Sequence, residues 1–123
     1  MQNTKFKYTI SLQGNDMDVK AAKALKSGDK LDLKRVWDEY DTYEIVVYTE
    51  KGEGLDMLGY AESVGIAPFL DNGTAEIVSA TVTEVETIEG TSRANDVTNV
   101  SFEVEFAYDD EYLAPFGGGY DET

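Results

Sequence analysis

The feature that most constrains the fold is a succession of short segments in which apolar and polar residues alternate, separated by polar turns. Such a period-two pattern is typical of β-strands that bury one face. It predicts strands at residues 5–13, 30–37, 75–86 and 99–108. The β-branched and aromatic residues of 44–49 predict another strand, and a short one is expected at 57–60. Six strands at this spacing in a chain of 123 residues predict one mainly β domain.

A short helix is predicted over residues 16–27. Acidic residues at its start and Lys23 and Lys26 near its end complement the helix dipole, and Gly28 follows as a stop signal. Together with the strands, this predicts an SH3/OB-like β-barrel of about six strands with two short helices. Closing such a barrel, or nearly closing it, leaves no strand edge exposed.

The second helix is predicted over residues 62–70, before the stop signal Asn72-Gly73. Pro68 lies inside this segment, and a proline in a helix interior removes a backbone hydrogen bond. We therefore expect the helix to begin near Gly65, or the segment to divide into two short turns.

The domain is expected to occupy residues 1–109. Residues 110–123 contain acidic residues and the triple glycine at 117–119, so we expect a flexible, acidic and Gly-rich tail there. No apolar run approaches the roughly 18 residues of a membrane span, and the first residues lack the apolar stretch of a secretory signal. These features predict a cytoplasmic protein that does not enter a membrane.

The absence of cysteine and histidine excludes thiolate nucleophiles, Ser-His-Asp triads, disulfides and Cys/His zinc sites. An enzyme would have to rely on carboxylates, for instance Asp38, Glu39 and Asp41 as a Mg²⁺ site, or a spaced pair as in glycoside hydrolases. No motif fixes the geometry of such a group. We therefore expect a binding module and no enzyme, with no catalytic residue, metal or cofactor.

Charge is unevenly distributed along the chain. The formal net charge is −15, which disfavours a polyanionic ligand and favours a basic partner. Residues 1–35 hold eight of the ten basic residues and four acidic ones, a charge of +4, whereas residues 36–123 hold two basic and 21 acidic residues, a charge of −19. One surface of the molecule can therefore still be basic.

The order of motifs between residues 28 and 85, roughly half of the chain, resembles a HIRAN domain, a small β-barrel module. The resemblance rests on Arg35 in a strand, the corner Tyr40-Asp41, and Gly59-Tyr60 before a helix. In DNA-binding members of that family, the tyrosine stacks on a terminal base and the aspartate accepts a hydrogen bond from the 3′ hydroxyl of a single strand. The resemblance implies that this corner binds the 3′ end of single-stranded DNA.

The candidate nucleic-acid-binding residues share this one predicted rim of the barrel. They are Arg35, Trp37, Tyr40, Asp41 and Tyr60. Two departures from the family pattern are the acidic segment Val36-Trp37-Asp38-Glu39 and the first strand's end, which lacks the usual basic and aromatic residues. Alternatively, Asp41 caps a turn and Tyr40 packs over the rim. Arg35 falls on the face of the core leucines, so it lies at the strand end or requires an acidic partner.

Four lysines are candidates for steering a phosphate backbone toward that rim: Lys20, Lys23, Lys26 and Lys34. The alternative is a solvated helix face. The charge of the chain also leaves open a function of another class, an acidic protein-interaction module or regulator that binds a basic protein without nucleic acid. Its binding would weaken with salt and would not depend on the Tyr40-Asp41 corner.

Overall fold

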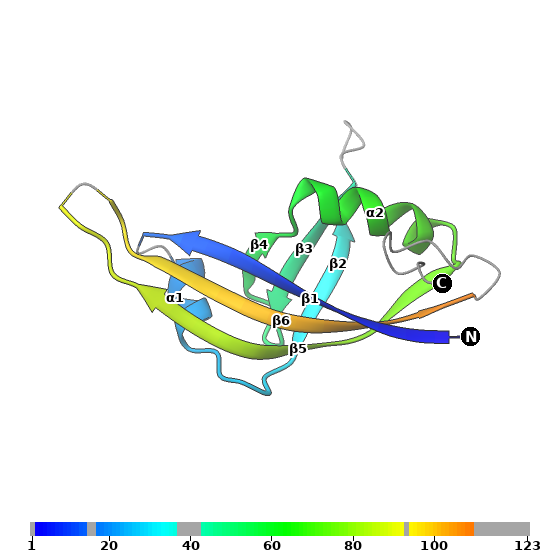
Figure 1. Cartoon of the computed structure of the whole chain (residues 1–123), viewed down its shortest axis with the longest axis horizontal. Helices are drawn as coiled ribbons and strands as arrows, with labels where there is room; N and C mark the ends of the chain where they lie inside the picture. Colours follow the sequence, from blue (N-terminus) through cyan, green and yellow to red (C-terminus); the bar gives the residue numbers. More distant parts are fainter. Residues whose placement is uncertain (1, 15–16, 37–42, 93, 110–123) are drawn as a thin grey trace, which may run out of the picture.

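The computed structural model describes residues 2–14, 17–36, 43–92 and 94–109, without the side chains of Met17, Asp18, Tyr60 and Ala61. Figure 1 shows the order of the elements. They are β1 (Gln2–Gln13), α1 (Met17–Lys23), β2 (Leu31–Val36), β3 (Glu44–Thr49), β4 (Gly54–Met57), α2 (Tyr60–Asp71), β5 (Ala75–Ile88) and β6 (Val97–Tyr108). Within these ranges, no helix is long and apolar enough to cross a membrane.

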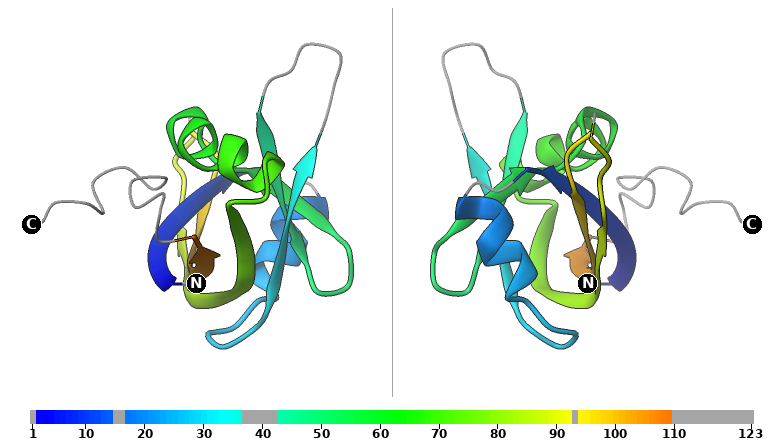
Figure 2. Two further views of the ribbon diagram at one scale, coloured as in Figure 1. Left: turned by 90° about the vertical axis from the view of Figure 1, so that its right-hand side faces the viewer. Right: turned by 90° about the vertical axis from the view of Figure 1, so that its left-hand side faces the viewer.

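The strands form two antiparallel sheets. Sheet A has the order β1-β6-β5, and sheet B has the order β2-β3-β4. The strands of sheet A have 12 to 14 residues and those of sheet B only four to six. In Figures 1 and 2, sheet A forms a long twisted ribbon, and the shorter sheet B lies across one side of it.

The prediction of a closed barrel is wrong, because the described strands remain in two sheets. On one side, the start of β2 is joined to β5: the Gly28 N–H donates to the Val82 carbonyl, and the Val82 N–H donates to the Asp29 carbonyl, both at 2.8 Å. On the other side, no pairing between β1 and β4 occurs among the described residues. A four-residue strand can cover only a third of a twelve-residue neighbour, so one edge of β1 stays unpaired.

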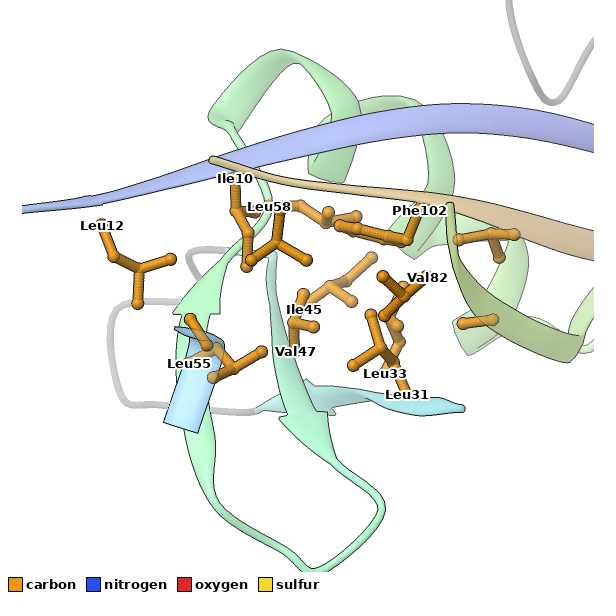
Figure 3. Close-up of a cluster of buried hydrophobic side chains, with 14 of the residues drawn as sticks. Ile10, Leu12, Leu31, Leu33, Ile45, Val47, Leu55, Leu58, Val82 and Phe102 are labelled. Carbon is orange, nitrogen blue, oxygen red and sulfur yellow. The ribbon is translucent and has the colours of Figure 1, made fainter. Parts of the chain in front are cut away.

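The core lies between the two sheets. Alternate residues of β6, from Val100 to Phe106, are fully buried and face the apolar residues of β2 and β3. Figure 3 shows side chains from both sheets, among them Leu33, Val47 and Phe102, pointing toward one another. From α1, Val19 and Ala22 are buried in the same core. Alternation in the strands thus produces one continuous apolar layer.

Most predicted elements are confirmed, with shifted ends. The strand at residues 44–49 has the predicted bounds, and the strands predicted at 5–13, 75–86 and 99–108 are each longer than expected. α1 ends at Lys23, four residues sooner than predicted, and Gly28 instead occupies a turn with φ 97°. The strand predicted at 57–60 is displaced by three residues: β4 spans Gly54–Met57, shares only Met57 with the prediction, and has one buried side chain, Leu55.

α2 departs from the prediction at Pro68. The helix begins at Tyr60, runs through Pro68 and ends at Asp71, so neither a start near Gly65 nor a division into two turns is correct. Pro68 lies in the last turn, and the helix continues for only three residues after it. The N–H that Pro68 lacks would have donated to the carbonyl of Val64, so the proline costs the helix one intrahelical bond, one turn before the helix ends.

Candidate functional site

Arg35 lies at the end of β2, on the inner face of sheet B, and its guanidinium is paired with Asp71 at the end of α2. Nε lies 3.1 Å from Oδ1 of Asp71, and Nη2 lies 3.2 Å from Oδ2. The two side chains are 9% and 21% exposed. This bidentate, charge-assisted geometry is the strongest arrangement for an arginine and a carboxylate. The expectation that an inward Arg35 needs an acidic partner is confirmed.

The same guanidinium contacts Val36 and Tyr43, the two residues that flank the segment 37–42 in the sequence. Its Nη1 donates a 2.6 Å hydrogen bond to the carbonyl of Val36, and its central carbon lies 5.5 Å from the centre of the Tyr43 ring. Tyr43 has φ 56°, a left-handed conformation that is costly for a residue with a side chain. Arg35 therefore fixes the two residues between which Trp37, Tyr40 and Asp41 lie in the sequence. Those three residues themselves lie outside the described part of the chain.

The start of α2 lies at the same end of sheet B. The Leu58 N–H donates to the carbonyl of Ile45 at 2.9 Å, and Ile45 pairs with Arg35 across β2 and β3. With strands about 4.8 Å apart, the backbone of Leu58 lies roughly 10 Å from that of Arg35. Gly59 precedes the helix, and Tyr60 is its first residue. The structure thus brings Arg35, the flanking residues Val36 and Tyr43, and the backbone of Gly59-Tyr60 to one end of the sheet.

Three of the predicted lysines lie elsewhere. Lys20 and Lys23 are exposed on α1, and Lys26 is exposed just after it. Beside them, a groove of about 210 Å³ runs between α1 and the β3–β4 turn; its lining includes Leu25, Lys30, Thr49, Lys51 and Glu53.

This groove, called the lysine groove because Lys30 and Lys51 line it, lies at the other end of sheet B from Arg35. Thr49, in its lining, is the last residue of β3 and pairs with Leu31, the first residue of β2. Arg35 lies four positions after Leu31 along the strand, a distance of roughly 13 Å. The groove and the Arg35 end are therefore two separate places.

Lys34 is the neighbour of Arg35 in sequence, but its side chain is on the outer face of sheet B. Its Nζ lies 3.6 Å from Asp32 and 5.3 Å from the centre of the Tyr48 ring. Among the described residues, no three acidic side chains are grouped so that they could hold a metal ion. The acidic residues Asp38, Glu39 and Asp41 lie outside the described ranges.

Sequence reasoning missed Asp71. One signal in the sequence was available: Asp71 directly precedes the Asn72-Gly73 stop, at the negative end of the helix dipole. An acidic side chain is unfavourable there unless a cation lies nearby. Arg35 supplies that cation from 36 residues away.

A search for relatives supports the fold without supplying a close one. No protein-family model matches the chain, and no curated protein matches it in sequence. Among solved structures, the HIRAN domain of human HLTF superposes on 96% of this chain and 90% of that domain, with a TM-score of 0.59 and 13% sequence identity. The fold is that of a HIRAN domain. The resemblance indicated by the sequence is therefore confirmed for the fold, and at this identity the HIRAN likeness concerns the fold alone.

Proposed function

We propose that this chain is a non-catalytic binding module that takes the 3′ end of single-stranded DNA at the Arg35 end of sheet B. The observation that carries the proposal is Arg35 itself, which holds Val36 on one side of segment 37–42 and Tyr43 on the other. The HIRAN fold and the Tyr40-Asp41 dipeptide in the sequence of that segment support the choice of a nucleic-acid end as the ligand. The backbone of Gly59-Tyr60 lies at the same end of sheet B.

The proposed recognition uses two interactions, the stacking of a base on Tyr40 and a hydrogen bond to Asp41. An aromatic ring such as Tyr40 stacks on any base, at about 1 to 3 kcal/mol per base, with Trp37 and Tyr60 as further aromatic contacts. The carboxylate of Asp41 accepts a hydrogen bond from a free 3′ hydroxyl and repels a 3′ phosphate. The site therefore recognises an end rather than a sequence.

Arg35 has a positioning role in this proposal. Its guanidinium is engaged by Asp71, the Val36 carbonyl and the Tyr43 ring, so most of its charge is neutralised within the fold. The lysines of α1 lie at the other end of sheet B, so they contribute to encounter at most through the general field. Affinity should then depend mainly on stacking, and it should weaken only modestly as salt rises.

The test is fluorescence anisotropy of a short labelled single strand, ending in a 3′ hydroxyl or a 3′ phosphate, titrated with the full chain. The hydroxyl-ended strand should bind more tightly, and Tyr40→Ala should weaken the binding of both strands because the stack is lost. Asp41→Asn should remove the discrimination and leave stacking intact. Equal affinity for both ends in the unchanged protein would show that the corner does not recognise a terminus.

A second candidate function is supported by the outer face of sheet A. Five glutamates lie on this face, opposite the core: Glu76, Glu84, Glu86, Glu103 and Glu105. Such a surface would attract a basic protein, and the affinity between the two would fall steeply as the salt concentration rises. Substituting Glu84 and Glu86 by Gln should weaken that binding while Tyr40→Ala leaves it unchanged. The opposite pattern would favour the end-binding function.

A further inference from the structure

The unpaired edge of β1 is distinct from the site proposed above. β1 pairs with β6 along all of its 12 residues, from Gln2 opposite Tyr108 to Gln13 opposite Val97. On its other side, no strand of the described chain pairs with it. Half of the backbone N–H and C=O groups of an edge strand point away from its one partner, so β1 offers a row of groups to which another strand can bond.

The two faces of β1 have opposite chemistry along its first half. Lys5 and Lys7 are exposed on the outer face, and Phe6 and Tyr8 lie on the inner face, half-buried against the core. Lys5 makes only a loose ion pair with Glu103, at 3.9 Å, and its side chain remains 59% exposed. Lys7 makes no ion pair with any described residue. Both lysines can therefore accept a further acidic neighbour.

β6 shows what kind of strand fits beside β1. Opposite Lys5 and Lys7 it places Glu105 and Glu103, and opposite Phe6 and Tyr8 it places Val104 and Phe102. The rings of Tyr8 and Phe102 are 5.9 Å apart, centre to centre. Because the side chains of a strand flank both of its edges alike, a segment with the same alternation matches the free edge.

We propose that the free edge of β1, over residues 2–8, binds an extended peptide that alternates acidic and apolar residues, and so adds a fourth strand to sheet A. The peptide backbone bonds to the outward N–H and C=O groups of β1. Its acidic side chains pair with Lys5 and Lys7, and its apolar side chains cover the exposed parts of Phe6 and Tyr8. The net charge of the chain opposes an acidic peptide at long range, but this repulsion is screened beyond about 8 Å at physiological salt.

The probe for this proposal is a synthetic peptide with the sequence of residues 99–108, Asn-Val-Ser-Phe-Glu-Val-Glu-Phe-Ala-Tyr, labelled for anisotropy and added to the ¹⁵N-labelled full chain. The peptide should bind, and amide exchange in residues 2–8 should slow while the amides of β6 keep their protection. A peptide with both glutamates replaced by lysine is the matched control. It should bind roughly fivefold to tenfold more weakly, as expected for the loss of two cross-strand ion pairs.

Variants of the protein test the same pairing from the other side. The double variant Lys5→Ser/Lys7→Ser should lose affinity for the glutamate peptide by a similar factor, and far-UV circular dichroism should show that it remains folded. The control Lys20→Ser/Lys23→Ser, on α1, should bind as the unchanged protein does.

Three results would overturn the proposal: no binding, equal affinity for the two peptides, or faster exchange in β6, which would mean that the peptide displaces that strand. Slowed exchange in residues 2–8 on concentrating the protein without peptide would also overturn it, because the edge would then pair with a second copy.

Discussion

Arg35 and Lys34 are adjacent residues of β2, and each forms an ion pair, but the two pairs lie on opposite faces of sheet B. Arg35 and Asp71 are 9% and 21% exposed and join β2 to the end of α2. Lys34 and Asp32 are 60% and 57% exposed and belong to the same strand. A pair between distant elements and shielded from water holds the fold together, whereas an exposed pair within one strand adds little.

This difference bears on function. At the Arg35 end, the guanidinium contacts Val36, Tyr43 and Asp71 at the end of α2. At the opposite end, Lys20, Lys30 and Lys51 line grooves beside α1, and Glu53 lies among them. The basic residues that line these grooves and the residues that shape the proposed site are therefore different residues. We therefore expect substitutions on the inner and outer faces of sheet B to change the free energy of unfolding by different amounts.

The largest effect is expected for Asp71→Asn. This change leaves a guanidinium that is 9% exposed beside a neutral amide, and the free energy of unfolding should fall by about 3 kcal/mol. Urea unfolding followed by circular dichroism measures the loss. A loss below about 1 kcal/mol would mean that water solvates Arg35 and that the comparison of the two faces is wrong.

The next effect is expected at Tyr8, on the inner face of β1. Burial of the hydroxyl, and secondly the negative charge of Glu62, raise the pKa of Tyr8 to about 12. In the unfolded chain this pKa is near 10, so the folded state holds the proton more tightly. The contribution of Tyr8 to stability is therefore complete below about pH 10 and is lost as the pH rises from about 10 to about 12.

Unfolding in urea at about pH 9 and about pH 11.5 tests this expectation. Tyr8→Phe should lose less stability than the unchanged protein between these values, because a phenyl ring does not titrate. The lysines titrate in both proteins, so their effect cancels in the difference. Identical losses in the two proteins would mean that the Tyr8 hydroxyl is as well solvated in the folded state as in the unfolded chain.

The smallest effect is expected for Asp32→Asn on the outer face. Its partner Lys34 is mostly exposed and also lies over the Tyr48 ring, so the free energy of unfolding should change by less than about 0.5 kcal/mol. The same urea experiment measures it. This variant is also the matched control for Asp71→Asn, since both replace an aspartate that pairs with a residue of β2. Equal losses in the two variants would remove the distinction between the faces.

Local pattern predicted the strands well because alternation is a local property. β3 was predicted with its observed bounds, since the segment 44–49 consists mainly of β-branched and aromatic residues. The bounds of β4 were not predicted, because β4 has a single buried side chain, Leu55. Its pairing with β3 also contains a register shift between Val47 and Tyr48. Whether the sheets close into a barrel depends on the match of strand lengths between β1 and β4, which lie far apart in the sequence.

The site was predictable in part for the same reason. The alternation of β2 placed Arg35 on the inner face and indicated that it needs an acidic partner, but no local signal connects Arg35 with Asp71, 36 residues away. The spacing of Lys20, Lys23 and Lys26 indicated a basic helix face, but could not show at which end of sheet B that face lies. Long-range packing decides both.

The most direct test of the account is a titration of the ¹⁵N-labelled full chain with a short single strand that ends in a 3′ hydroxyl, followed by the amide chemical shifts. The account predicts shifts in segment 37–42, at Arg35 and Val36, at Tyr43, and at the start of α2, with little change in α1 or around Lys51. Shifts confined to α1 and the lysine groove would contradict it, because the strand would then bind to free positive charge rather than to the end that Arg35 organises.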